Sequence, residues 1–280
     1  MGVRTCRHVG AGPSLDEVSH PTAPPPTDAE YPDLRGKVVL VTGAGSGIGR
    51  AMALAFARQG ALLGLLDTAP EPIQETLQTS DAEGTAVVGD VRDETSVEAA
   101  LAAVRARLGP PDVVVNNAGT GGRDAPKPTH LTPPDEWREV LEVNVTGPFL
   151  VSRAALPAML ERGSGTIINV SSVVGMIALG GRSPYAASKA AVLHLTHNLA
   201  VEYGEHGIRA NALCPGWTRT PMMSWRLEEE AFRERVRATV PLGRVAEPDE
   251  QARACLFLAS SASSYLNGHG LVVDGGWSVA

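Results

Sequence analysis

The pair Tyr185 and Lys189 combines two residue types that can move a proton at an oxygen atom. Four positions apart, the two side chains would share one face of a helix. A free tyrosine has a pKa of about 10 and is a poor base at neutral pH. An ammonium group one helical turn away would stabilise the phenolate and lower that pKa. The pair therefore indicates an acid/base centre, although a surface pair without chemistry has the same spacing.

A glycine-rich segment at residues 42–49, Thr-Gly-Ala-Gly-Ser-Gly-Ile-Gly, is the second candidate for chemistry. Glycines allow a tight turn and the close approach of a pyrophosphate, and the start of a helix adds N–H donors. Asp67 follows Gly49 by 18 residues, where dinucleotide-binding folds place an acid that binds ribose hydroxyls. Its carboxylate would repel a 2′-phosphate, which favours NAD over NADP. An ordinary loop and a helix cap are the alternative interpretations.

Short apolar strands alternating with helices must hold these groups together. The alternation predicts the α/β class: a single-domain Rossmann fold with a doubly wound parallel sheet of about seven strands and helices on both faces. Ligands of such folds bind beyond the carboxyl ends of the strands. We expect Thr132 to cap a long helix that follows it. Strands are predicted at 38–41, 61–66, 86–88, 113–115, 167–170, 208–213 and 271–273, and further helices at 48–59, 96–108 and 184–203.

Residues 1–33 differ in composition from the rest of the chain. Pro21 and the run Pro24-Pro25-Pro26 stand among small polar residues, with little apolar surface to bury. This composition predicts a disordered N-terminal extension. Residues 34–280 are predicted to form one catalytic domain, since they contain neither an internal repeat nor a second compositional block.

Further motifs follow one another in order along residues 34–280. Asn116-Asn117-Ala118-Gly119 comes after the strand at 113–115, Ser172 precedes Tyr185 by 13 residues, and Pro215-Gly216 follows the strand at 208–213. Together with Thr42-Gly43-x-x-x-Gly47-x-Gly49, Asn144 and Tyr185-Ala-Ala-Ser188-Lys189, this order resembles the short-chain dehydrogenase/reductase family. The resemblance extends from Leu34 to Trp277 and implies the family's fold and a nicotinamide-dependent oxidoreductase.

The resemblance implies a catalytic set of four residues. Tyr185 is expected to be the general acid/base, and Lys189 to stabilise its phenolate and hold the nicotinamide ribose. Ser172 is expected to donate a hydrogen bond to the reacting oxygen. Asn144 is expected to hold a water that links Lys189 to solvent, whereas Ser171 is assigned a structural role.

The resemblance also implies a set of NAD-binding positions. Asp90 is expected to meet the adenine, Asn117 to steady the sheet, and Thr218 and Thr220 to contact the carboxamide. The full predicted set is Gly43, Ser46, Gly47, Ile48, Gly49, Asp67, Asp90, Val91, Asn117, Ala118, Gly119, Tyr185, Lys189, Pro215, Gly216, Thr218 and Thr220.

Net charge and cysteine content limit the classes of partner and the compartment that we expect for this protein. A net charge of −7 and a pI of about 5.5 disfavour nucleic acid. The three cysteines fit neither a zinc pattern nor a disulfide framework, and no apolar run suits a membrane span, so we expect a cytoplasmic protein. His194 and His197 lack acidic or cysteine partners at ligand spacing, so they are predicted to be packing or interface residues and no metal is expected.

Three loops are expected to form the substrate site: 120–131, 173–184 and 217–240. Apolar side chains in the last two predict an apolar or cyclic alcohol or ketone. These are Met176, Ile177, Leu179, Trp217, Met222, Met223, Trp225 and Leu227. Arg182, Arg219 and Arg226 could instead bind an anionic substrate or face water.

Three other functions remain open at this stage. A methyltransferase also uses a glycine turn and an acid but has no need for Tyr185 and Lys189. A non-catalytic NAD-binding regulator usually loses a catalytic residue. A 3-oxoacyl carrier-protein reductase has a loop similar to residues 172–175, although such enzymes generally use NADPH and Asp67 disfavours that cofactor. Family resemblance further predicts a homotetramer, or a homodimer, built on two long helices and the C-terminal segment.

Overall fold

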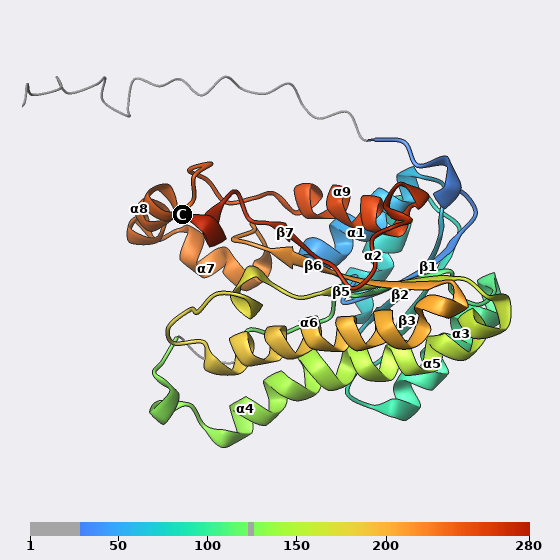
Figure 1. The fold of residues 1–280 in the computed structure, drawn as a ribbon, viewed down its shortest axis with the longest axis horizontal. Helices are drawn as coiled ribbons and strands as arrows, with labels where there is room; N and C mark the ends of the chain where they lie inside the picture. The colour runs from blue at the N-terminus through green and yellow to red at the C-terminus, as the bar shows by residue number, and fades with distance from the viewer. Residues whose placement is uncertain (1–28, 123–125) are drawn as a thin grey trace, which may run out of the picture.

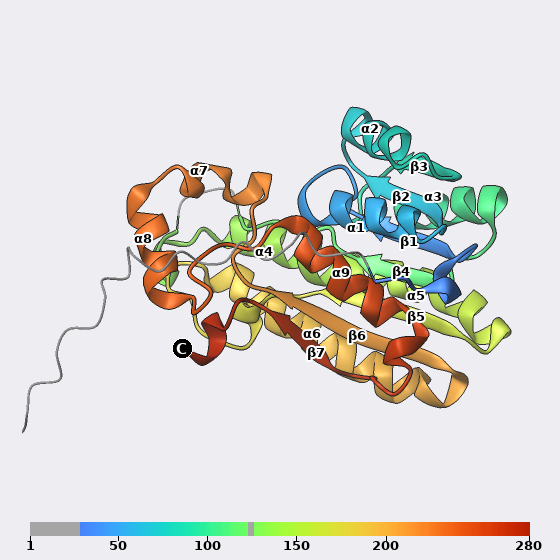
Figure 2. The same ribbon diagram turned by 90° about the horizontal axis from the view of Figure 1, so that it is seen from above.

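The computed structural model describes residues 29–122 and 126–280. Its centre is one parallel sheet of seven strands in the order β3-β2-β1-β4-β5-β6-β7 (Figures 1 and 2). This confirms the predicted fold. The strands are β1 (Val38–Thr42), β2 (Leu62–Asp67), β3 (Gly84–Val88), β4 (Val113–Asn116), β5 (Gly165–Val170), β6 (Ile208–Pro215) and β7 (Gly270–Val273).

Helices cover both faces of the sheet. One apolar cluster joins a face of the sheet to α1, α2 and α9, and another joins the opposite face to α3, α5 and α6. The strands between these layers are nearly continuous apolar runs, as burial on both faces requires. The helices are α1 (Gly47–Arg58), α2 (Pro70–Ser80), α3 (Glu94–Leu108), α4 (Pro134–Leu141), α5 (Gly147–Arg162), α6 (Ser183–Tyr203), α7 (Ser224–Leu227), α8 (Glu230–Thr239) and α9 (Pro248–Ala259).

The strand order reverses between β1 and β4, because β2 and β3 lie on one side of β1 and the later strands on the other. Loops that leave the two strands there diverge to opposite faces and leave a crevice at the carboxyl edge. Figures 1 and 2 show α7 and α8 beyond this edge, where β6 ends. The sheet therefore positions a site between the glycine turn after β1 and the segments that follow β4, β5 and β6.

The segment around Thr132 departs from its prediction. Pro133, not Thr132, is the residue before α4, and the Thr132 hydroxyl donates to the carbonyl of Pro128 instead of capping the helix. The predicted long helix is also divided. A π-helical turn at Glu142–Thr146 separates α4 from α5 and contains Asn144. Such turns interrupt the regular ladder and often occur at functional sites.

The predicted N-terminal extension falls mostly outside the described residues. Its last five residues are described, and three of them contact the domain: the carbonyl of Ala29 accepts from the side-chain amide of Gln59 (3.2 Å), and Tyr31 and Asp33 make further contacts. Tyr31 packs against the apolar cluster around α1, and the backbone N–H of Tyr31 donates to the side-chain oxygen of Gln59 (2.7 Å). The carboxylate of Asp33 accepts from the N–H of Ser261 (2.7 Å).

Helix α9 begins with a reciprocal capping arrangement. The side chain of Glu247 accepts from the backbone N–H of Glu250, and the side chain of Glu250 accepts from the N–H of Glu247. Arg244 adds two contacts to the same Glu250 carboxylate, at 2.7 and 2.8 Å. These hydrogen bonds lower the pKa of Glu250 to about 2. The start of α9 therefore depends on an ionised Glu250.

The variant Glu250→Gln is expected to reduce the free energy of unfolding at pH 7 by on the order of 1 kcal/mol, since the pair is partly exposed. The folded-state pKa lies below the unfolded value, so the stabilisation is present above about pH 4.3 and is lost as pH falls toward 2. Urea unfolding from pH 7 down to pH 3 measures it. Glu234→Gln, on the exposed face of α8, is the control, and an equal effect of both variants at pH 7 contradicts the interpretation.

Candidate active site

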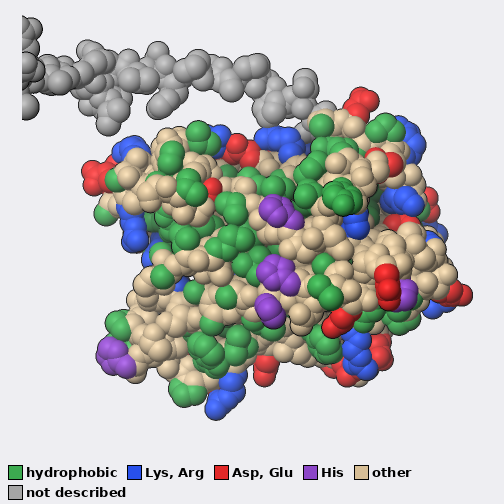
Figure 3. Space-filling model, in the orientation of Figure 1, with side chains coloured by type: hydrophobic (Ala, Val, Ile, Leu, Met, Phe, Trp, Pro, Cys, Tyr) green, Lys and Arg blue, Asp and Glu red, His purple; other side chains and the backbone are tan. Residues whose placement is uncertain are grey.

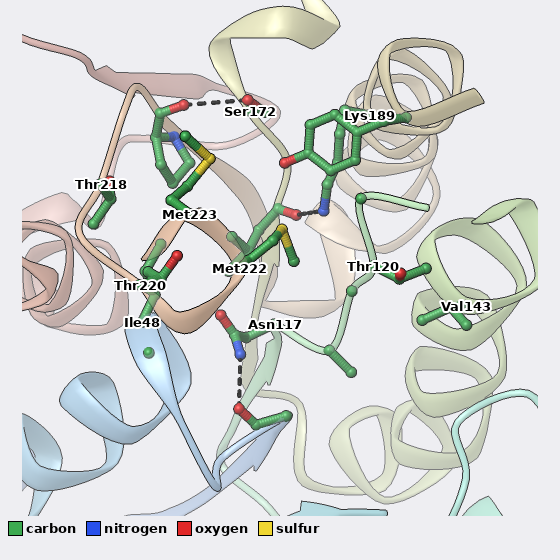
Figure 4. Close-up of a pocket in the computed structure, with 18 of the residues that line it drawn as sticks. Ile48, Asn117, Thr120, Val143, Ser172, Lys189, Thr218, Thr220, Met222 and Met223 are labelled. Carbon is green, nitrogen blue, oxygen red and sulfur yellow. Dashed lines mark hydrogen bonds between the residues drawn. The ribbon is translucent and has the colours of Figure 1, made fainter. Parts of the chain in front are cut away.

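One cavity of about 510 Å³ opens at the carboxyl edge of the sheet. Every predicted site residue lines it except Gly49 and Asn144, which lie behind its wall. Figure 4 shows Ser172 and Lys189 on one side of this cavity, Ile48 and Asn117 at its base, and Thr218 and Thr220 on a third side. The predicted residues that line it come from seven segments spread over the chain, so the fold brings them together.

The glycine turn after β1 leaves room only for glycine at its closest contacts. A Cβ on Gly49 would lie 2.1 Å from the carbonyl oxygen of Gly43, and one on Gly43 would lie 2.8 Å from the Cα of Ala118. Gly47 has a φ of +53° and faces Thr220. The turn thus presents bare backbone and the start of α1 to the cavity, which fits the pyrophosphate of a dinucleotide.

Asn117 fastens this turn to the end of β4. Its side-chain amide donates to the carbonyls of Thr42 (3.0 Å) and Gly43 (3.1 Å), and its backbone N–H donates to the Thr42 hydroxyl (3.0 Å). The N–H of Ala118 donates to the same hydroxyl. Asn117 therefore holds the two sides of the crevice at a fixed separation (Figure 4).

Asp67 stands at the end of β2 with its carboxylate toward the glycine turn. One oxygen accepts from the N–H of Gly45 (2.8 Å) and the other from the N–H of Ala69 (3.1 Å). Ala69 is itself the residue before α2, so Asp67 does not cap that helix. Asp90 lines the same end of the cavity, where Arg92 lowers its pKa through a close ion pair (2.6 Å).

Tyr185 lies in the first turn of α6, and Ser172 begins the loop after β5. Burial raises the pKa of Tyr185, while a hydrogen bond with Ser172 and the positive charge of Arg182 oppose that rise. The Ser172 hydroxyl also donates to the carbonyl of Pro215 (3.2 Å). The tyrosine is therefore a protonated group at neutral pH, with a hydroxyl beside it.

Lys189 is buried one turn further along α6. Its Nζ lies 5.5 Å from the centre of the Tyr185 ring and donates to the carbonyl of Val170 (2.8 Å). Loss of hydration lowers the pKa of Lys189 to about 8. The hydrogen bond with Ser172 and the charge of Arg182 are the influences that lower the pKa of Tyr185 in this structure, and stabilisation of a Tyr185 phenolate by Lys189 stays a prediction. Ser171 has the structural role expected of it, since its hydroxyl donates to the Lys189 carbonyl (2.7 Å).

Both polar atoms of the Asn144 side chain form hydrogen bonds within the protein. Its oxygen accepts from the N–H of Thr120 (2.8 Å), and its nitrogen donates to the Thr120 carbonyl (2.9 Å) and to the Ser188 hydroxyl (2.9 Å). Ser188 in turn donates to the carbonyl of Tyr185 (2.7 Å). A Cβ on Gly119 would lie 3.3 Å from the Asn144 oxygen and 3.4 Å from Lys189 Nζ. Asn144 thus links the loop after β4 to the catalytic helix.

The substrate end of the cavity includes most of the side chains proposed for it. Leu179, Trp217, Met222, Met223, Trp225, Arg182 and Arg226 line it. Met176, Ile177 and Leu227 do not. Arg219 points elsewhere and pairs with Glu247 (2.9 Å). The corrections at Met176, Ile177 and Leu227 share one cause, since a loop sequence does not show which of its side chains turn inward. For Arg219, the alternative of a side chain that faces water holds.

Several lining residues were not singled out from the sequence. They include Thr68, Arg92, Glu139, Val143 and Trp277, whereas Thr120 and Gly121 belong to the predicted loop 120–131. Trp277 stacks on Trp217, with ring centres 4.5 Å apart, and so brings the C-terminal segment to the cavity. A residue 60 positions from its partner has no local signal; only the neighbouring Gly-rich turn at 275–276 marks a change of direction.

Among residues 29–122 and 126–280, no group of three or more His, Cys, Asp or Glu could hold a metal ion. His194 and His197 are exposed on α6 with ring centres 5.8 Å apart. Within the same ranges, no helix is long and apolar enough to cross a membrane.

Known proteins share this arrangement. The family model described as enoyl-(acyl carrier protein) reductase matches residues 43–278. A 2-(R)-hydroxypropyl-CoM dehydrogenase from Xanthobacter autotrophicus is 43% identical over 245 residues, which cover 86% of this chain and 98% of the relative. The chain belongs to the short-chain dehydrogenase/reductase family.

Two solved structures extend the comparison. A 3-ketoacyl-(acyl-carrier-protein) reductase from Brucella melitensis, complexed with NADH, has a TM-score of 0.82 and 35% identity over 88% of this chain and 100% of its own. A gluconate 5-dehydrogenase from Burkholderia cenocepacia, in complex with NADP and tartrate, has a TM-score of 0.83 and 36% identity over 88% and 96%. The protein is therefore an oxidoreductase with a nicotinamide dinucleotide site.

Proposed function

We propose that this short-chain dehydrogenase/reductase interconverts a secondary alcohol and a ketone with NAD(H), using Tyr185 as the general acid/base. The observation that carries the proposal is the shared cavity. Tyr185, Ser172 and Lys189 line one end, and the glycine turn and Asp67 line the other. The names of the relatives, a hydroxypropyl dehydrogenase and a 3-ketoacyl reductase, denote alcohol and ketone chemistry.

The bound nicotinamide ring would supply or accept the hydride. Tyr185 would donate its proton to the ketone oxygen as the carbinol forms, and would take that proton back in the opposite direction. Ser172 would donate a hydrogen bond to the same oxygen and stabilise its developing negative charge. Lys189 would then support the Tyr185 phenolate that remains, because its ammonium lies at one helical turn.

Asn144 has a positioning role in this account. Its amide joins Thr120 to Ser188, and Ser188 joins the backbone of Tyr185. The π-helical turn aims the amide inward between α4 and α5. We propose that a water near Gly119 connects Lys189 to solvent for proton exchange, since both Asn144 and Lys189 flank that glycine.

The proposed preference for NAD comes from Asp67. Its carboxylate lies in the cavity at the end of β2, fixed by the N–H groups of Gly45 and Ala69. There it can accept hydrogen bonds from two ribose hydroxyls, whereas a 2′-phosphate would meet like charge. Because a 3-ketoacyl reductase of similar structure is complexed with NADH, NAD use does not exclude that substrate class.

Removing the acid/base group gives the most direct mutational test. Tyr185→Phe is expected to reduce kcat/KM for ketone reduction by about 10²- to 10⁴-fold, because phenylalanine lacks the phenol that acts as general acid. The KM for NADH should change little. Tyr203→Phe, at the far end of the same helix, is the matched control. Steady-state NADH oxidation measures both variants, and unchanged turnover in Tyr185→Phe refutes the mechanism.

The wild-type enzyme is expected to have a higher kcat/KM with NAD than with NADP. Asp67→Asn keeps the shape of the side chain but removes its charge, so the preference should fall at least roughly tenfold. Asp81→Asn, at the exposed end of α2, should leave the ratio unchanged. Initial rates with both cofactors decide the question, and a wild-type preference for NADP would overturn the proposal.

The pH dependence of ketone reduction should follow Lys189. Its pKa of about 8 means that the ammonium is present below that pH and lost above it. We expect kcat/KM for reduction to be level near pH 7 and to fall as pH rises through about 8, since support for the Tyr185 phenolate is lost. A pH–rate profile measures this, with far-ultraviolet circular dichroism as the folding control. A level profile to pH 9.5 would contradict it.

We further propose a cytoplasmic homotetramer, with a homodimer as the alternative. Buried free thiols at Cys214 and Cys255 suit a reducing compartment. Large apolar side chains are exposed on adjoining helices: Trp137 on α4, Phe149 on α5 and Val201 on α6. Light scattering is expected to give four times the 29.2 kDa chain mass. A monomer mass at working concentration refutes the assembly.

A further inference from the structure

The substrate end of the cavity contains two arginines. Arg182 is the residue before α6, three positions ahead of Tyr185, and Arg226 lies in α7. Both side chains line the cavity and both are half-buried. They come from segments 44 residues apart, so their presence in one cavity is a consequence of the fold.

Each guanidinium is held in place by its surroundings. Arg182 donates to the carbonyl of Gly121 (2.9 Å), and a Cβ on Gly121 would lie 3.5 Å from the sulfur of Met222. Met222 stands one helical turn before Arg226. The Arg226 guanidinium lies 4.9 Å from the Trp225 ring and 5.8 Å from the Phe232 ring. The loop after β4 and the segment that contains α7 thus bring the two arginines to the same cavity. Figure 4 shows Met222 among the residues that line this cavity.

The charge of Arg182 acts on Arg226 and on the catalytic tyrosine. Burial lowers the pKa of both arginines, and the charge of Arg182 lowers the pKa of Arg226 further. The charge of Arg182 also lowers the pKa of Tyr185. Two carboxylates act in the opposite direction, Glu136 on Arg182 and Glu229 on Arg226, but Glu136 is itself paired with Lys127 (2.9 Å). Arg182 therefore contributes positive charge beside the reacting hydroxyl of Tyr185.

We propose that Arg182 and Arg226 form an anion subsite for the substrate. The inference rests on the proposed dehydrogenase function and narrows its substrate class to alcohols or ketones that also contain a carboxylate or sulfonate. Paired guanidinium groups suit the oxygens of such anions, and partial burial strengthens the contact. Leu179, Trp217 and Met222 line the space around the apolar part of the molecule.

A binding experiment tests the subsite without turnover. Propane-1-sulfonate and butanoate are titrated into the NADH complex, followed by NADH fluorescence, against the neutral methyl propyl sulfone and butanamide. The wild-type complex is expected to bind each anion at least roughly tenfold more tightly than its neutral analogue. Arg226→Gln and Arg182→Gln should each weaken anion binding by about 10- to 100-fold. Arg219→Gln, whose arginine pairs with Glu247, is the matched control.

A turnover experiment links the subsite to catalysis. The enzyme is assayed with 4-oxopentanoate, 5-oxohexanoate and their methyl esters. The acids are expected to have the higher kcat/KM, and Arg226→Gln should remove that preference by raising KM for the acids only. The KM for NADH should stay constant, which separates a substrate contact from a contact with the cofactor phosphates.

The outcomes are distinguishable. Equal binding of anions and neutral analogues overturns the subsite, as does an equal effect of Arg226→Gln and Arg219→Gln. A rise in the KM for NADH alone reassigns Arg226 to the cofactor and also overturns it. Turnover of neutral ketones without any preference for the acids overturns the subsite but still supports the proposed dehydrogenase function. Tight anion binding without turnover of any ketone supports the subsite and refutes the proposed reaction.

Discussion

The hydrogen bonds of Asn117 to Thr42 and Gly43 are the constraint on which the site depends. They join the ends of β1 and β4, the two neighbouring strands at which the chain order reverses. On its other side the glycine turn is held by Asp67, which accepts from the N–H of Gly45, whereas the Asn117 side chain ties the turn to the end of β4. The absence of side chains at Gly43 and Gly49 allows this approach, because a Cβ at either would clash with neighbouring backbone.

A second polar connection continues from this point to the chemistry. The loop after β4 runs through Gly119 to Thr120, which Asn144 holds by both its N–H and its carbonyl. From Asn144 the connection passes through Ser188 to the backbone of Tyr185. The chain of contacts therefore joins cofactor turn, β4 loop, π-helical turn and catalytic helix. Positions in such a chain are set together, which explains why residues from distant segments share one cavity.

The sequence predicts those features that depend on local spacing. Strand and helix alternation, the glycine turn, Asp67 and the Tyr185–Lys189 pair each require particular residues at fixed separations, and the structure brings nearly all of them to one cavity. It does not predict features that depend on tertiary packing. The residues next to Trp277 do not indicate that it stacks on Trp217. Likewise, the residues next to Arg219 do not indicate that it pairs with Glu247 while Arg226 lines the cavity. The prediction that Thr132 caps α4 is wrong, because the two prolines that follow Thr132 shift the start of the helix by one residue, to Pro134.

The central claim is hydride transfer to a carbonyl carbon at this site, and isotope transfer tests it most directly. A ketone substrate is reduced with NADH that has deuterium in place of both hydrogens at C4 of the nicotinamide, and the product is analysed by mass spectrometry and proton NMR. The account predicts one deuterium on the carbinol carbon, and none on that carbon when unlabelled NADH is used in D₂O. A product without deuterium on that carbon, or with deuterium there taken from D₂O, would contradict it.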